Sequence, residues 1–171
     1  MRRTMKRRST VPVVLACLVT VVSLWAAAGG ASAADLESIG SKATAGWTET
    51  TEKAATAPEQ KKVLENGKVA TVTGELVEVS CYLQLGKRGE AHAPCGSDCI
   101  KHGQPAGIVD EKGTLTLLFV EEHDPRRYGQ IDVRDKLAPL VAKQVSATGM
   151  LTTKDGRAAL YVHGSDIGAA K

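Results

Sequence analysis

Apolar and polar residues alternate along several short stretches in the C-terminal two thirds of the chain. The first stretch, VATVTGELVEVSCYL at 69–83, is rich in Val and Thr, which favours a long β-strand. Its apolar positions change phase between Leu76 and Val77, which predicts a β-bulge that bends the strand. Four further strands are predicted from similar patterns, at 106–110, 114–122, 144–153 and 157–167.

A short helix is predicted at 134–143, interrupted by Pro139, just ahead of the fourth strand. Five strands with a long bent first one, and a helix before the fourth, resemble the OB-fold, a small closed Greek-key barrel. The stretches VTGELVEV and VSATGML share a T-G-x-L core and resemble paired strands of that fold. The resemblance covers 67–168 and implies a mainly β five-stranded barrel with one or two short helices.

A second resemblance rests on VTGELVEVSCYL, the cysteine- and histidine-containing segment after it, and GQPAG. This combination is similar to a group of uncharacterised exported bacterial proteins. The resemblance implies an exported OB-like domain that carries cysteines, and it implies no particular activity.

Residues 34–66 precede the barrel and show little apolar periodicity. They are rich in Ala, Thr, Glu and Lys, and Pro58 breaks any long helix. We therefore expect a flexible or partly helical lead-in.

The first 33 residues have the pattern of a secretory signal peptide. Five basic residues precede an apolar run, which ends in the small residues Ala31, Ser32 and Ala33. We expect cleavage after Ala33, and an uncleaved membrane anchor is the alternative. Cleavage predicts an exported protein, periplasmic or secreted, without membrane attachment.

The charge of the remaining chain bears on its partners. The leader holds five of the 22 basic residues and none of the 19 acidic ones, so the rest has 17 basic and 19 acidic residues and a formal net charge of −2. OB-folds that bind nucleic acid stack bases on aromatic residues over a basic groove. This chain has neither a basic patch nor many aromatic residues, so we expect no nucleic-acid partner. The expected partners are a metal ion and an exported protein.

The most unusual feature is a segment that gathers cysteine and histidine within residues 81–102. Beyond the leader, the chain has three cysteines, and two of its four histidines lie beside them. In the barrel interpretation, 84–104 is an inserted loop after the first strand, and Pro94 and Gly103 bracket a short helix within it. On such a helix four residues form one stripe facing the strand that carries Cys81: His92, Cys95, Cys99 and His102.

In the first interpretation, this segment binds a metal ion. Three thiolates and one imidazole suit zinc, or Cu(I) in an exported protein. We expect Cys81, Cys95 and Cys99 as ligands, with His92 as the preferred fourth ligand and His102 as its substitute. The C-x3-C unit also resembles copper sites of oxidase subunits and copper-delivery proteins, although those sites place the next histidine differently and no methionine is nearby here.

Two other interpretations stay open. Cys81 could pair with Cys95 or Cys99 in a disulfide, which would give a stapled, non-enzymatic binding module with one free thiol. Alternatively the C-x3-C pair could exchange disulfides as a thiol–disulfide oxidoreductase, although the usual C-x-x-C spacing is missing. No catalytic triad, phosphate loop or carboxylate pair stands out, so the sequence gives no grounds for calling the protein an enzyme.

Overall fold

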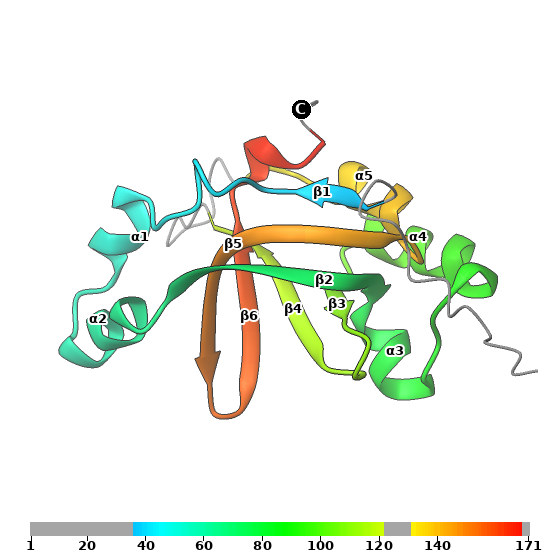
Figure 1. Ribbon diagram of the computed structural model, residues 1–171, viewed down its shortest axis with the longest axis horizontal. Helices are drawn as coiled ribbons and strands as arrows, with labels where there is room; N and C mark the ends of the chain where they lie inside the picture. The colour runs from blue at the N-terminus through cyan, green and yellow to red at the C-terminus, as the bar shows by residue number, and fades with distance from the viewer. Residues whose placement is uncertain (1–35, 122–130, 169–171) are drawn as a thin grey trace, which may run out of the picture. The chain divides into compact units, whose positions relative to one another are not determined.

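The computed structural model describes residues 36–121 and 131–168, and within them five strands form a closed barrel (Figure 1). Around the barrel the order is β5, β2, β3, β4 and β6, and pairing of β5 with β6 closes the ring. Strands β4 and β6 run parallel, and the other pairs in the ring are antiparallel. The predicted OB-like Greek-key barrel is therefore confirmed. Its strands are β2 (Lys68–Glu78), β3 (Ala106–Val109), β4 (Leu115–Val120), β5 (Gln144–Lys154) and β6 (Arg157–Val162).

The first barrel strand differs from the prediction at its end. Strand β2 stops at Glu78, and the next residues form helix α3 (Val79–Leu85). The predicted bulge is wrong, because Leu76 and Val77 pair with Ile108 and Gly107 in unbroken register. The change of apolar phase marks instead the point where β2 leaves β5 for β3 and becomes buried on both faces.

The later elements lie close to their predicted positions. Helix α5 (Arg134–Leu137) and the 3-10 turn η3 (Ala138–Leu140) occupy the predicted helical segment, which Pro139 divides. The last strand ends earlier than predicted, because the 3-10 turn η4 (Gly164–Asp166) follows it. Asp155 and Gly156 both have positive φ, which suits the two-residue hairpin between β5 and β6. The predicted signal peptide and Glu122, the end of a predicted strand, lie outside the described residues.

The segment ahead of the barrel is packed against it. It contains β1 (Glu37–Ile39), which pairs in parallel with β5, and helices α1 (Glu49–Ala54) and α2 (Pro58–Glu65). Ile39 is fully buried in the core. Trp47 lies edge-to-face against Tyr161 of β6, with ring centroids 5.5 Å apart.

The hydrophobic core fills the barrel and extends to the elements that cover it. It joins Leu76, Ile108 and Leu160 of the barrel wall to Ile100, which comes from the segment inserted between β2 and β3. Within the described residues, no helix combines the length and the apolar character that crossing a membrane requires.

Candidate metal centre

Helix α3 begins because Glu78 caps it. The fully buried carboxylate accepts hydrogen bonds from the backbone N–H groups of Ser80, at 2.6 Å, and Cys81, at 2.8 Å. Such bonds satisfy donors that have no partner inside the helix. Cys81 therefore lies in the first turn of a helix, and the prediction that placed it on the first strand is wrong.

Helix α4 (Ala93–Lys101) carries the other two cysteines and matches the predicted short helix. Pro94 lies in its first turn. At its end the N–H of Gly103 donates to the Ile100 carbonyl at 2.9 Å, and that of Gln104 donates to the Cys99 carbonyl at 3.0 Å. This pair of bonds is a Schellman ending, which requires the positive φ of Gly103.

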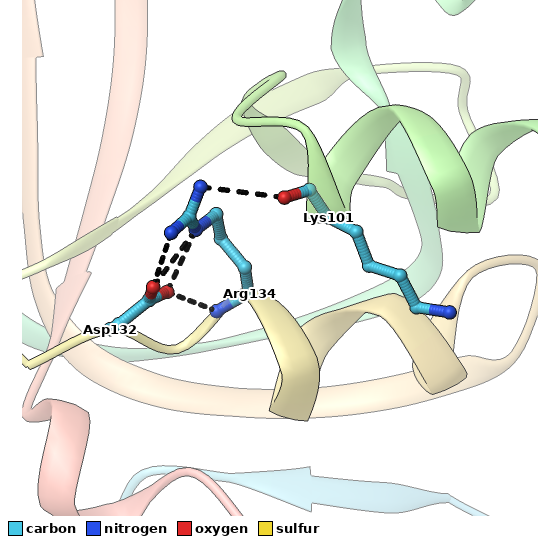
Figure 2. A network of polar contacts seen from close by, with 3 residues as sticks. All are labelled: Lys101, Asp132 and Arg134. Atoms are coloured by element: carbon cyan, nitrogen blue, oxygen red, sulfur yellow. Dashed lines mark hydrogen bonds and ion pairs between the residues drawn. The ribbon is translucent and has the colours of Figure 1, made fainter.

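Packing and one polar network hold α4, which is only nine residues long. Ile100 is 1 % exposed and belongs to the core. Arg134 of α5 donates from Nη1 to the Lys101 carbonyl at 3.4 Å, while Asp132 holds the same guanidinium through Nε and Nη2 (Figure 2). The network ties α5 to the C-terminal end of α4. A positive charge is favourable at that end of a helix.

His92 is the most informative residue of the segment. It ends the 3-10 turn η2 (Glu90–His92), just ahead of α4, and is 6 % exposed. Its ring lies against Gly96, where a Cβ atom would be 3.4 Å from Nε2. Within the described part of the chain Nε2 has no hydrogen-bond partner. A buried ring nitrogen without a partner is unfavourable, so its burial needs a physical reason.

Glu78, Cys81 and His92 meet at one point. One carboxylate oxygen, the thiol sulfur and one ring nitrogen all lie within 4.8 Å of one another. A tetrahedral metal with bonds of about 2.0 to 2.3 Å separates its ligand atoms by roughly 3.3 to 3.8 Å. Small side-chain movements would therefore bring these atoms to coordination distance.

Cys95 and Cys99 are outside this 4.8 Å group, but both interact electrostatically with Cys81. The pKa of Cys81 is raised to about 11, chiefly by its hydrogen bond to Glu78, then by desolvation and by the negative charges of Glu78, Cys99 and Cys95. Desolvation and then the charge of Cys95 raise the pKa of Cys99, whose side chain also hydrogen-bonds with those of Cys95 and Cys81. All three thiols are free. We call these five residues the α3–α4 cluster: Glu78, Cys81, His92, Cys95 and Cys99.

His102 does not join the cluster. It is exposed, and its Nδ1 is hydrogen-bonded to the Asp98 carbonyl at 2.7 Å, one turn back along α4. Between the two predicted histidines, only His92 is brought to Cys81.

Glu78 belongs to the site but was not among the residues predicted from the sequence. Its signal is an acidic residue inside the apolar run LVEVS, where a strand residue would be buried, three positions ahead of a cysteine. An acidic residue at such a position can cap a helix and accept a hydrogen bond from the thiol three residues later.

The fold and the cluster define a class of protein: an OB-like barrel with a cysteine- and histidine-bearing helical insertion between its first two strands. Comparison with family models, curated proteins and solved structures finds no match to this chain.

Proposed function

We propose that the protein is exported and binds a zinc or Cu(I) ion at the α3–α4 cluster, with Cys81, His92, Cys95 and Cys99 as ligands. The observation that carries this proposal is the buried, unpartnered Nε2 of His92, on a ring that lies within 4.8 Å of the sulfur of Cys81. A metal ion is a partner that a neutral imidazole and a thiolate both favour.

The charges of the cluster support a cation. All five causes that act on the pKa of Cys81 raise it, and none is a basic side chain. Several acidic groups thus oppose one another's ionisation, and among the described residues no basic side chain compensates them in the pKa of Cys81. A bound cation reverses this balance, stabilises the thiolates and releases their protons to solvent.

The arrangement suits a structural or metal-handling role better than a catalytic one. Four protein ligands leave no open coordination position for a substrate. Ligands on η2, α3 and α4 would cross-link the whole insertion, so metal binding would contribute folding free energy. Cys95 is exposed while Cys81 and Cys99 are half-buried, so one edge of the cluster is open to a thiol donor or acceptor of the metal.

A disulfide staple is the second candidate, because Cys81 and Cys99 are near enough to influence each other's pKa. A bond between them would join α3 to α4 and leave Cys95 free, giving a stapled binding module. A thiol–disulfide oxidoreductase is less well supported, since reactive thiols have lowered pKa values and those of Cys81 and Cys99 are raised.

The test is metal analysis and a free-thiol count on the purified exported protein, followed by titration of Zn²⁺ and of Cu⁺ into the reduced, metal-free form. We expect one tightly bound ion per chain and three thiols protected from alkylation while the ion is bound. A metal-free protein with one free thiol would overturn the proposal in favour of the staple.

Two histidine variants make the titration specific. His92→Ala should weaken metal binding by at least about tenfold, because it removes a direct ligand. His102→Ala is the matched control, since it changes a histidine of the same segment that faces solvent. Equal effects of the two substitutions would contradict the proposed ligand set.

A further inference from the structure

A second candidate site lies away from the cluster. A cavity of about 980 Å³ opens between the lead-in helices, the β4–β6 face of the barrel and α5, and none of the five cluster residues lines it. Its walls are largely apolar and include Trp47, Val63, Phe119, Ile131 and Tyr161. Pockets for small organic ligands have this size and character.

The wall of this cavity contains a buried carboxylate. Glu121 follows β4, lines the cavity and is 2 % exposed. Its Oε1 accepts a hydrogen bond from the backbone N–H of Thr48 at 2.7 Å, which fixes the start of α1. Its Oε2 has no hydrogen-bond partner among the described residues. Anchoring α1 uses one carboxylate oxygen and leaves the other without a role.

The described lining supplies no cation to Glu121. It contains one basic side chain, Arg134, whose guanidinium is already engaged by the carboxylate of Asp132 and the Lys101 carbonyl (Figure 2). Burial of an ionised carboxylate is costly unless a positive charge or hydrogen-bond donors compensate it.

The aromatic residues in the cavity wall also favour a positively charged ligand. The rings of Trp47 and Phe119 both lie close to the ring of Tyr161, with centroid distances of 5.5 Å and 5.6 Å. Aromatic faces attract organic cations. Three of the six large apolar side chains that are exposed among the described residues also line this cavity: Val63, Phe119 and Ile131.

We propose that this cavity binds a small organic cation with an apolar or aromatic body, whose ammonium group donates to Oε2 of Glu121. The carboxylate provides the charge, the aromatic residues enclose the body of the ligand, and neither part depends on metal binding at the α3–α4 cluster.

The test compares three aromatic probes of similar size and different charge by calorimetry on the full chain: benzylammonium, benzyl alcohol and benzoate. We expect benzylammonium to bind at least tenfold more tightly than either of the others. Glu121→Gln, which keeps the shape of the side chain, should remove this preference and leave benzyl alcohol unaffected. Glu75→Gln is the control, because Glu75 is also buried but is paired with Arg88 outside the cavity.

A measurement on the unaltered protein keeps the test valid if Glu121→Gln does not fold. The indole N–H of Trp47 donates to the Leu64 carbonyl at 3.0 Å beside the cavity, so benzylammonium should shift its NMR resonance. An absence of both binding and shift overturns the proposal, as does a preference for benzoate. Arg126 and Arg127 follow Glu121 closely in the sequence. Binding that appears only after both are replaced by glutamine also overturns the proposal, because the chain would then provide the cation itself.

Discussion

Glu78 performs three tasks at the junction of β2 and α3. Its two oxygens accept the first free N–H groups of α3, and the carboxylate also hydrogen-bonds with the Cys81 thiol. A carboxylate offers about four acceptor positions, so these contacts are compatible. The same side chain therefore starts the helix, orients Cys81 and keeps its thiol protonated while no metal is bound.

The reactivity of the three thiols tests this interpretation. Because the pKa of Cys81 is raised from 9.0 to about 11, its thiolate fraction at pH 8 is about a hundredfold smaller than at the ordinary value. In the reduced, metal-free protein we expect iodoacetamide to modify Cys81 more slowly than the exposed Cys95, as followed by peptide mass spectrometry. Glu78→Gln should accelerate the reaction of Cys81, and Glu75→Gln should not. Equal rates at Cys81 and Cys95 in the unaltered protein would contradict the assigned environment.

The same shift predicts how stability depends on pH. Between about pH 9 and pH 11 the unfolded chain releases the Cys81 proton while the folded protein keeps it, so the free energy of unfolding falls as pH rises. Below about pH 9 this contribution is fully present. We expect the Tm of the reduced, metal-free protein to decline more steeply across this interval than that of Cys81→Ser. Parallel declines would show that other groups account for the whole effect.

At the scale of elements, α4 is short and contains Gly96, which by propensity alone weakens a helix. The structure shows what the glycine permits. A Cβ atom at this position would lie 3.0 Å from Cγ1 of Val141 and 3.4 Å from Nε2 of His92. Gly96 thus allows α4 to approach η3 closely and leaves room for the His92 ring.

We therefore expect Gly96→Ala to destabilise the protein. The gain in helix propensity is about 1 kcal/mol, whereas forcing a methyl group into a packed contact costs about 1 to 3 kcal/mol. In a Val141→Ala background the crowding is relieved, and the same substitution should become stabilising. Urea unfolding of the four proteins in this double-mutant cycle measures the coupling. Additive effects would mean that the contact with Val141 does not limit this position.

The elements also show how far the sequence could lead. Proline, glycine and alternating apolar residues marked α4, α5 and all five barrel strands, because those signals are local. Helix α3 could not be found this way, since VEVSC has the composition of a strand and the buried cap at Glu78 decides otherwise. Likewise His92 and His102 are both three positions from a cysteine, so their spacing cannot distinguish them. The packing of His92 against Gly96 shows which one is buried.

At the scale of the whole molecule, the barrel is one part of a larger fold. Strand β1 extends the sheet beside β5, and Ile39 both pairs with Ala147 and forms a bridge with Ile167 near the end of the described chain. The lead-in and the C-terminal turn thus meet over the barrel. Trp47 attaches the helical part of the lead-in to β6, the strand that closes the ring beside β5, through Tyr161.

Ile39 is thus a core residue although it lies well ahead of the barrel sequence. Ile39→Ala should lower the free energy of unfolding by about 2 to 5 kcal/mol, because the side chain is fully buried and its removal leaves a cavity. Val69→Ala is the matched control, since Val69 is an apolar strand residue that is 47 % exposed, and we expect it to cost less than about 1 kcal/mol. Urea denaturation of both variants checks the difference. If the lead-in did not unfold together with the barrel, Ile39→Ala would lower the free energy of unfolding no more than Val69→Ala. The barrel of Ile39→Ala would then unfold at an unchanged urea concentration. A loss within the expected range would instead show that residues ahead of Lys68 unfold together with the barrel.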